Sequence, residues 1–220
     1  MIKIIKINNN YRFIKNNQNL KTENGNTLFV KKKKHAELIV EEFLQRTKSN
    51  DPNTLLNLTL FSCNLNKDEI EQIKKKIIEF LNFDLLLFRS FDETKLVKTM
   101  EKEFDPFICE FEDLFDCKFE KIYSIVHSGN LQPLLFKSYL DRLDIFKFTT
   151  LFKLSSLTKS VILSYFFLNK KINYNTLYKL TNIEYNYQQK RWGTVEEQLL
   201  MNKDLRDRIR NISFFFKNIS

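Results

Sequence analysis

The stretch MIKIIKINNNYRFIKNNQNLKTENGNTLFV, residues 1–30, alternates apolar and polar residues in the manner of β-strands. Ile2, Ile4 and Ile7 keep roughly every second position, and residues 11–14 continue the pattern. Asparagine pairs and the segment 24–26 interrupt it, and Asn and Gly favour tight turns because they tolerate left-handed backbone conformations. We therefore expect a small antiparallel meander that ends at about residue 30.

After the meander, apolar residues recur at the spacing of a helix. Apolar residues between 36 and 44 fall on one face of a helix, and a second apolar segment covers 55–61. Asn66 with Glu69 three residues later is the capping-box pattern that opens a helix, here continuing to about residue 81.

The segment from 85 to 125 mixes strand and helix signals. Leu85-Leu86-Leu87-Phe88 is a candidate for a short buried strand, and Phe119, Ile122 and Ile125 are candidates for one more. A long helix is expected between them, over about 93–115. Pro106 should bend or split that helix, because proline lacks the backbone N–H that a helix interior needs.

Strand signals largely vanish beyond Gly129. Helical patterns separated by short polar turns cover 134–143, 148–168, 174–181 and 184–216. The sequence therefore predicts an α+β fold with a domain boundary near 128–132. Residues 1–130 would form a domain with a small antiparallel sheet and helices, and residues 131–220 an all-helical domain.

Composition leaves the choice of partner open. The 220 residues include 36 Lys and Arg against 27 Asp and Glu, a net charge of +9 that ordinarily suggests an anionic partner. However, Phe, Lys, Asn and Ile have A/T-rich codons and are abundant, whereas Ala occurs once. A biased genome would explain part of the lysine content, so a basic nucleic-acid-binding adaptor is kept only as an alternative.

The residues of common catalytic and metal sites are sparse. His35 and His127 are the only histidines, and we expect the first to be exposed after Lys31–Lys34, a solvated loop, and the second to be structural. The three cysteines form no CxxC pair, and three glycines cannot build a phosphate-binding loop. No enzyme activity, cofactor or metal is therefore expected.

The segment Glu184-Tyr185-Asn186-Tyr187-Gln188-Gln189-Lys190-Arg191-Trp192-Gly193 is the most specific motif in the chain. It resembles the E-x-x-Y/W-Q-x-x-x-W-G signature of the ATP synthase assembly chaperones of the ATP-twelve family. That resemblance implies a chaperone that binds the free α subunit of F-type ATP synthase. It also implies partner contacts for Glu184, Tyr187, Gln188 and Trp192.

Weaker matches follow in the family's order. They are Leu20-Lys21-Thr22 with Gly25, Glu42-Phe43, Asp51-Pro52, the segment from Asp84 to Arg89, and Phe104-Asp105-Pro106. Two departures stand out: Lys159-Ser160 replaces a glycine-serine pair, and the acidic cluster before the signature glutamine is reduced to Glu184. The resemblance covers about residues 11 to 205.

Helical spacing supports a contact role for the signature. Glu184, Gln188 and Trp192 recur at i, i+4 and i+8 and so share one stripe of a helix. Trp192 has two interpretations, an interface anchor or a residue that locks the last helix into the core, and for Trp192 alone the core is favoured. Gly193 would then allow close packing or end the helix.

Taken with the resemblance, these residues predict a monomeric, non-enzymatic assembly chaperone that neither binds nucleic acid nor inserts into a membrane. No apolar run approaches the ~20 residues that span a bilayer. The first residues have neither the apolar run of a signal peptide nor the Arg-rich and Ser-rich character of a transit peptide. We expect the cytoplasm of an α-proteobacterium, with the mitochondrial matrix as the alternative.

Overall fold

The computed structural model describes residues 2–45, 51–90, 94–123, 129 and 131–219. Its sheet consists of β1 (Ile2–Ile7), β2 (Asn10–Lys15), β3 (Gln18–Asn19) and β4 (Phe29–Val30). β2 pairs antiparallel with each of the other three strands, with Ile4 opposite Phe13 in the β1–β2 ladder. The predicted meander is confirmed.

Asparagines make the turns of this sheet. Asn8 and Asn9 join β1 to β2 with φ of 46° and 64°, and Asn16 and Asn17 join β2 to β3 with φ of 52° and 61°. Two consecutive positive φ angles give a hairpin turn whose twist matches that of its strands. Asparagine adopts this conformation more readily than most other residues. The asparagine pairs therefore form turns, and the strand pattern is interrupted at these positions.

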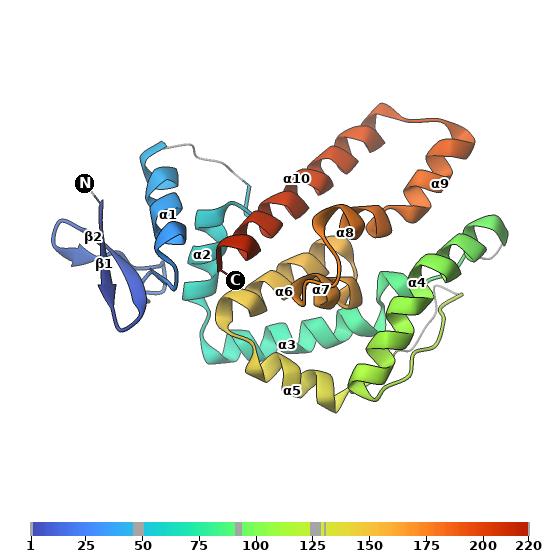
Figure 1. Cartoon of the computed structure of the whole chain (residues 1–220), viewed down its shortest axis with the longest axis horizontal. Helices are drawn as coiled ribbons and strands as arrows, with labels where there is room; N and C mark the ends of the chain where they lie inside the picture. The colour runs from blue at the N-terminus through green and yellow to red at the C-terminus, as the bar shows by residue number, and fades with distance from the viewer. Residues whose placement is uncertain (1, 46–50, 91–93, 124–128, 130, 220) are drawn as a thin grey trace.

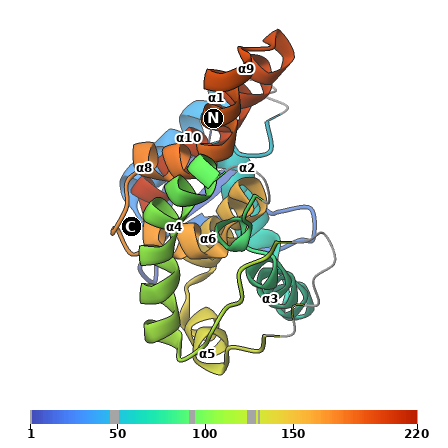
Figure 2. The ribbon, with the colours of Figure 1, turned by 90° about the vertical axis from the view of Figure 1, so that its right-hand side faces the viewer.

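Helices make up most of the remaining described chain (Figures 1 and 2). They are α1 (Lys33–Gln45), α2 (Leu55–Asn64), α3 (Lys67–Asn82), η1 (Leu85–Leu87), α4 (Thr94–Phe115), α5 (Leu134–Arg142), α6 (Ile145–Thr158), α7 (Val161–Leu168), α8 (Tyr174–Thr181), α9 (Ile183–Trp192) and α10 (Glu196–Ile219). The sheet and α1 lie at one end of the molecule, α6 and α7 lie in its middle, and α9 lies at the other end (Figure 1). The predicted α+β class is confirmed.

The capping box of α3 forms as the sequence predicts. Asn66 Oδ1 accepts from the Glu69 backbone N–H at 2.9 Å, and Glu69 Oε2 accepts from the Asn66 N–H at 2.8 Å. Ile73, Ile77 and Leu81 then turn the apolar face of the helix into the core. Local hydrogen bonds and burial therefore specify the same helix start.

The predicted strand at Leu85–Phe88 is wrong. Residues 85–87 form the short 3₁₀ helix η1, because the Asp84 side chain accepts from the Leu86 N–H at 3.0 Å and caps it. Among the described residues of this segment, strand pairing is limited to a parallel bridge between Phe88 and Ile122. The second predicted strand is thus reduced to Ile122, and Ile125 lies outside the described residues.

Two long predicted helices are each divided. The helix expected over 148–168 is broken at Lys159, which has a φ of +57°, and Ser160 then caps α7 by accepting from the Leu163 N–H at 3.0 Å. The helix expected over 184–216 is broken at Gly193. Conversely, Pro106 does not split α4. The buried residues of α4, including Phe104 and Ile108, lie on both sides of the proline, so packing maintains one helix.

The core is rich in phenylalanine. Phe111, Phe115, Phe136 and Tyr165, from α4, α5 and α7, form a cluster with ring centroids 4.6–5.4 Å apart. Aromatic pairs at such distances add stability beyond the area that they bury. The cluster joins residues on both sides of position 130.

The predicted domain division at 130/131 stays a prediction. The named strands of the described residues end at Val30, as expected for an all-helical second half. However, α10 packs against α2 and α6, and the Ser62 hydroxyl of α2 donates to Thr149 Oγ1 of α6 at 2.9 Å. Any boundary at this position therefore crosses a packed interface.

The expected exposure of His35 is also wrong. Lys33 and Lys34 already belong to α1, and His35 is only 1% exposed. Its ring lies edge-on to Phe146 and Phe215, with centroids 6.2 and 5.7 Å away. Burial lowers its pKa to about 4, so the ring is neutral at pH 7. His127 lies outside the described residues.

Candidate functional site

Helix α9 contains most of the signature segment and places Glu184, Gln188 and Trp192 along one stripe. Glu184 lies exposed in the first turn, where a negative charge interacts favourably with the helix N-terminus. Gln188, one turn later, donates from Nε2 to Glu184 Oε1 at 3.1 Å. Among the described residues Glu184 forms no ion pair, so its carboxylate remains available to a cation from outside.

Trp192 lies at the end of this stripe and is 65% exposed. The interpretation of Trp192 as a core residue is therefore wrong. The Arg191 guanidinium lies 5.2 Å from its ring centroid. By contrast Tyr187, also predicted to contact a partner, is half-buried against the core.

Gly193 determines where the stripe ends. Its φ of +85° and ψ of −174° are accessible to glycine and strained for other residues. A Cβ atom at this position would meet nothing within 4 Å, so the glycine is required for the backbone conformation and not for close packing. The chain reverses here and starts α10, and the α9–α10 connection lies at the edge of the molecule (Figure 1).

This connection bears an exposed apolar surface, here called the tip. Its large apolar residues are between 48% and 65% exposed, and they are Trp192, Val195, Leu199, Leu200 and Met201. Large exposed apolar side chains concentrated in one segment are typical of interaction sites. The sequence prediction missed all of it except Trp192, although five apolar residues within ten positions was an available signal.

A hollow of about 270 Å³ adjoins the other end of the stripe. It lies between η1, α4 and the α8–α9 corner. Its apolar lining consists of Leu85, Phe88, Met100, Phe104, Leu180 and Ile183. Its polar lining consists of Thr181, Glu184, Tyr185 and Gln188. Motif residues that are about 80 positions apart in the chain therefore meet at one place.

Asp84 anchors the segment that forms one wall of the hollow. The carboxylate is fully buried, and its Oδ2 accepts from the backbone N–H groups of Val161 at 2.6 Å and Ile162 at 3.0 Å, at the start of α7. Burial raises the pKa of Asp84 to about 6, although these N–H donors oppose the rise. The carboxylate is thus mainly ionised at pH 7 and fixes η1 to α7.

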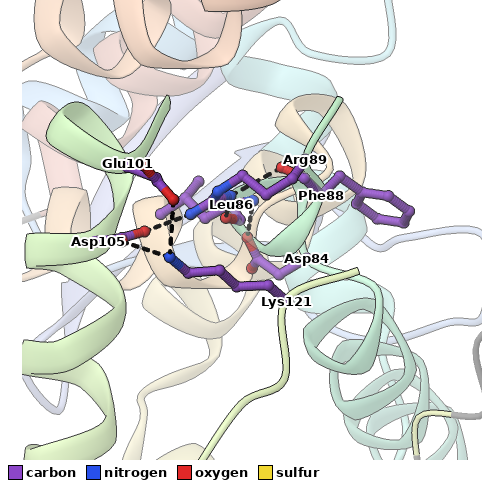
Figure 3. Close-up of polar contacts among 7 residues, drawn as sticks. All are labelled: Asp84, Leu86, Phe88, Arg89, Glu101, Asp105 and Lys121. Carbon is purple, nitrogen blue, oxygen red and sulfur yellow. Dashed lines mark hydrogen bonds and ion pairs between the residues drawn. The ribbon is translucent and has the colours of Figure 1, made fainter. Parts of the chain in front are cut away.

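Arg89 anchors the same segment to α4. Its guanidinium donates to the carbonyl oxygens of Leu86 and Phe88, the latter at 2.8 Å, and it forms an ion pair with Asp105 (Figure 3). Lys121 Nζ also contacts Asp105, at 2.8 Å (Figure 3). Phe104 lies beneath the guanidinium, 5.7 Å from ring centroid to charge. These contacts position Phe88 and its neighbours.

The structure brings most of the motif residues together, but not all. Phe104, Glu184 and Gln188 line the hollow. Asp84, Arg89 and Asp105 do not line it, but their contacts hold the segment 85–88 that forms part of its wall. Phe43 belongs to α1 and is half-buried against the core. Helix α1 lies beside the sheet and far from α9 (Figure 1). Pro106 lies within α4 and does not line the hollow.

Two kinds of site are not found within the described residues. No group of three or more His, Cys, Asp or Glu side chains is arranged to hold a metal ion. Within the same residues, no helix has both the length and the apolar character needed to cross a membrane. The site contains a stripe that is exposed at Glu184 and Trp192 and half-buried at Gln188, with a hollow at one end and the apolar tip at the other. Apolar and polar surface combined in this way is typical of a protein-binding surface.

Comparison with known proteins also indicates a protein that binds other proteins. The model of the ATP12 chaperone protein family matches residues 4–112. The mitochondrial protein atp12 of Schizosaccharomyces pombe is 26% identical over 209 residues, which cover 87% of this chain and 72% of that protein. The chain belongs to the ATP12 chaperone family.

Solved structures show the same fold. Atp12 from Paracoccus denitrificans superimposes with a TM-score of 0.81 at 21% identity, covering 100% of this chain and 96% of the other. A protein from Agrobacterium tumefaciens gives 0.83 at 17% identity, with 100% and 84% covered. The family consists of chaperones and not of enzymes, in agreement with the sequence-based expectation. Membership favours this function over the nucleic-acid-binding adaptor.

Proposed function

We propose that this chaperone binds the free α subunit of F-type ATP synthase and covers a surface that aggregates until the β subunit pairs with it. The contact residues would be Glu184, Gln188 and Trp192, with Tyr187 supporting them from the half-buried side of α9. The observation that carries the proposal is the stripe of α9, whose ends Glu184 and Trp192 are exposed and which continues into the apolar tip.

Release follows from competition. A chaperone that binds only the unassembled subunit is displaced when the partner subunit binds the same surface more tightly. An exposed apolar tip suits this role, since apolar contact is non-directional and is lost without a chemical step. The chaperone would act as a monomer, in the cytoplasm of an α-proteobacterium or in the mitochondrial matrix.

Glu184→Lys tests the contact role of the stripe. Losing a helix-terminal charge interaction costs only about 0.3–1 kcal/mol of stability. Reversing a charge at a desolvated contact costs about 2–5 kcal/mol of binding. We therefore expect nearly unchanged melting and a sharp loss of capture of the α subunit from the same genome, with Glu184→Gln intermediate.

Asp68→Lys is the matched control, because Asp68 is an exposed acid in the first turn of α3. It removes the same kind of helix-terminal charge at a place outside the stripe, so it should melt slightly earlier and capture normally. If Glu184→Lys folds and captures the α subunit as well as Asp68→Lys does, Glu184 is not a contact residue.

A further inference from the structure

The hollow beside Glu184 has the size of a socket for a side chain. A dry cavity of about 150 Å³ lined by Leu, Ile and Phe already admits a benzene ring. The hollow measures about 270 Å³, and six of its ten lining residues are apolar. It is smaller than the roughly 300–1,000 Å³ of pockets that hold whole small-molecule ligands. One large aliphatic or aromatic side chain fits this description.

The polar rim indicates what lies next to that side chain. Three cations near the hollow already have acidic partners: Lys179 pairs with Glu103 at 3.0 Å, and Arg89 and Lys121 both pair with Asp105. Glu184 lines the hollow, is exposed, and forms no ion pair within the part of the chain that the structure describes, so its negative charge is not neutralised there. Its complement is a Lys or Arg side chain close to the apolar one.

A buried hydroxyl group also borders the hollow. The Tyr185 hydroxyl is buried and has no hydrogen-bond partner among the described residues. A buried polar group without a partner costs free energy. A bound backbone or side chain that supplied a hydrogen bond to Tyr185 would remove that cost.

We propose that the hollow binds one large apolar side chain of the client, and that a Lys or Arg within about three residues of it pairs with Glu184. The inference rests on the proposed function in taking the α subunit as the client. Trp192 lies eight residues beyond Glu184 on the same stripe, about 12 Å along the helix axis. A client segment seated in the hollow therefore extends towards Trp192 and the tip.

Overlapping peptides from the α subunit of the same genome test the recognition rule. Trp192 is the single tryptophan of the chain, so its emission reports the binding of peptides that lack tryptophan. We expect blue-shifted emission with peptides that combine a large apolar and a basic residue. Replacing either residue, by Ser or by Glu respectively, should weaken binding about tenfold. Equal binding of peptides without such a pair overturns the rule.

Variants of the hollow test its location with the whole α subunit. Phe88→Ala removes a 38% exposed wall residue while keeping the backbone carbonyl that Arg89 contacts, and Thr181→Phe fills the hollow from the rim. Each should weaken capture about tenfold. Phe214→Ala is the matched control, since Phe214 is 46% exposed on α10 and does not line the hollow. It should capture normally.

The outcomes separate the two proposals. If the wild-type chain fails to capture the α subunit, the proposed function fails. If it captures and both folded hollow variants bind as well as Phe214→Ala, only the socket is wrong. If the hollow variants instead change the sedimentation of the chaperone alone, the occupant is a second copy of the chain, and the inference is overturned.

Discussion

The segment around Asp84 and the signature helix α9 both carry charged and aromatic motif residues, but their environments are opposite. Asp84 and Arg89 are at most 5% exposed, and their polar atoms are largely used to join η1 to α7 and α4. Glu184 and Trp192 are exposed, and the side-chain hydrogen bond of Glu184 is with Gln188 of its own helix. Some residues of the family's motifs therefore maintain the fold, whereas others remain available to a partner. Burial distinguishes the two roles.

The largest effect is expected at Asp84. Asp84→Ala would leave the N–H groups of Leu86, Val161 and Ile162 buried without acceptors, a loss of about 3–5 kcal/mol in the free energy of unfolding. Urea unfolding measures this loss. Asp113→Ala, at an exposed position of α4, serves as the control and should change stability little. A loss below about 1 kcal/mol at Asp84 would contradict the anchoring role.

His35 provides a pH-dependent version of the same contrast, because it is buried like Asp84 but neutral. Its pKa is lowered from 6.5 to about 4 by burial, so the unfolded chain takes up a proton first as the pH falls. Stability should therefore fall by roughly 3 kcal/mol between pH 6.5 and pH 4 from this residue. Urea unfolding across that range should show the fall, reduced in His35→Phe. An identical pH dependence in both proteins would refute this assignment.

A smaller effect is expected at Gly193, where the buried body gives way to the tip. Alanine at a φ of +85° and ψ of −174° is strained, so Gly193→Ala should cost about 1–2 kcal/mol or alter the angle between α9 and α10. Thermal unfolding and far-ultraviolet circular dichroism measure both results. Thr194→Ser, at the exposed next residue, is the control, because it keeps the hydroxyl that accepts from Gln189 Nε2 at 2.7 Å. An unchanged melting temperature and spectrum would mean that the connection does not require this conformation.

The smallest effect on stability is expected at the tip itself. Leu200 and Met201 are 63% and 64% exposed, so replacing either with Ser should change the free energy of unfolding by no more than about 0.5 kcal/mol. Urea unfolding of Leu200→Ser and Met201→Ser checks this. A loss of 2 kcal/mol or more would show that these residues pack against the body, and the contrast with Asp84 would disappear.

Local signals account for the parts of the structure that the sequence predicted. Asparagine turns, period-two alternation and the Asn66 capping box act over a few residues, and each appears where expected. The failures at Leu85–Phe88 and His35 have another origin. In both cases partners from distant segments, α7 for Asp84 and the Thr59, Phe146 and Phe215 side chains for His35, determine the outcome.

The candidate site shows the same division. The spacing of Glu184, Gln188 and Trp192 predicted one helical stripe, which α9 contains. Spacing alone could not show that Trp192 faces solvent, because a helical stripe can point towards the core or away from it. The hollow was also unpredictable, since its walls come from η1, α4, α8 and α9 and exist only after these elements pack.

By itself the sequence determined the α+β class, the turns and most helix positions, because these depend on the periodicity of nearby residues. It also indicated the family, because the motifs keep the family's order along the chain. Only the tertiary structure decided which motif residues are buried and which are exposed. Solvent exposure depends on what packs against each side chain, and here the packing partners can lie far apart in the chain, as Phe88 and Glu184 do at the hollow and His35 and Phe215 do in the core. Asp84 is buried because α7 packs over it. Glu184, which lines the hollow, and Trp192, at the end of α9, are exposed because no element of the described chain covers them.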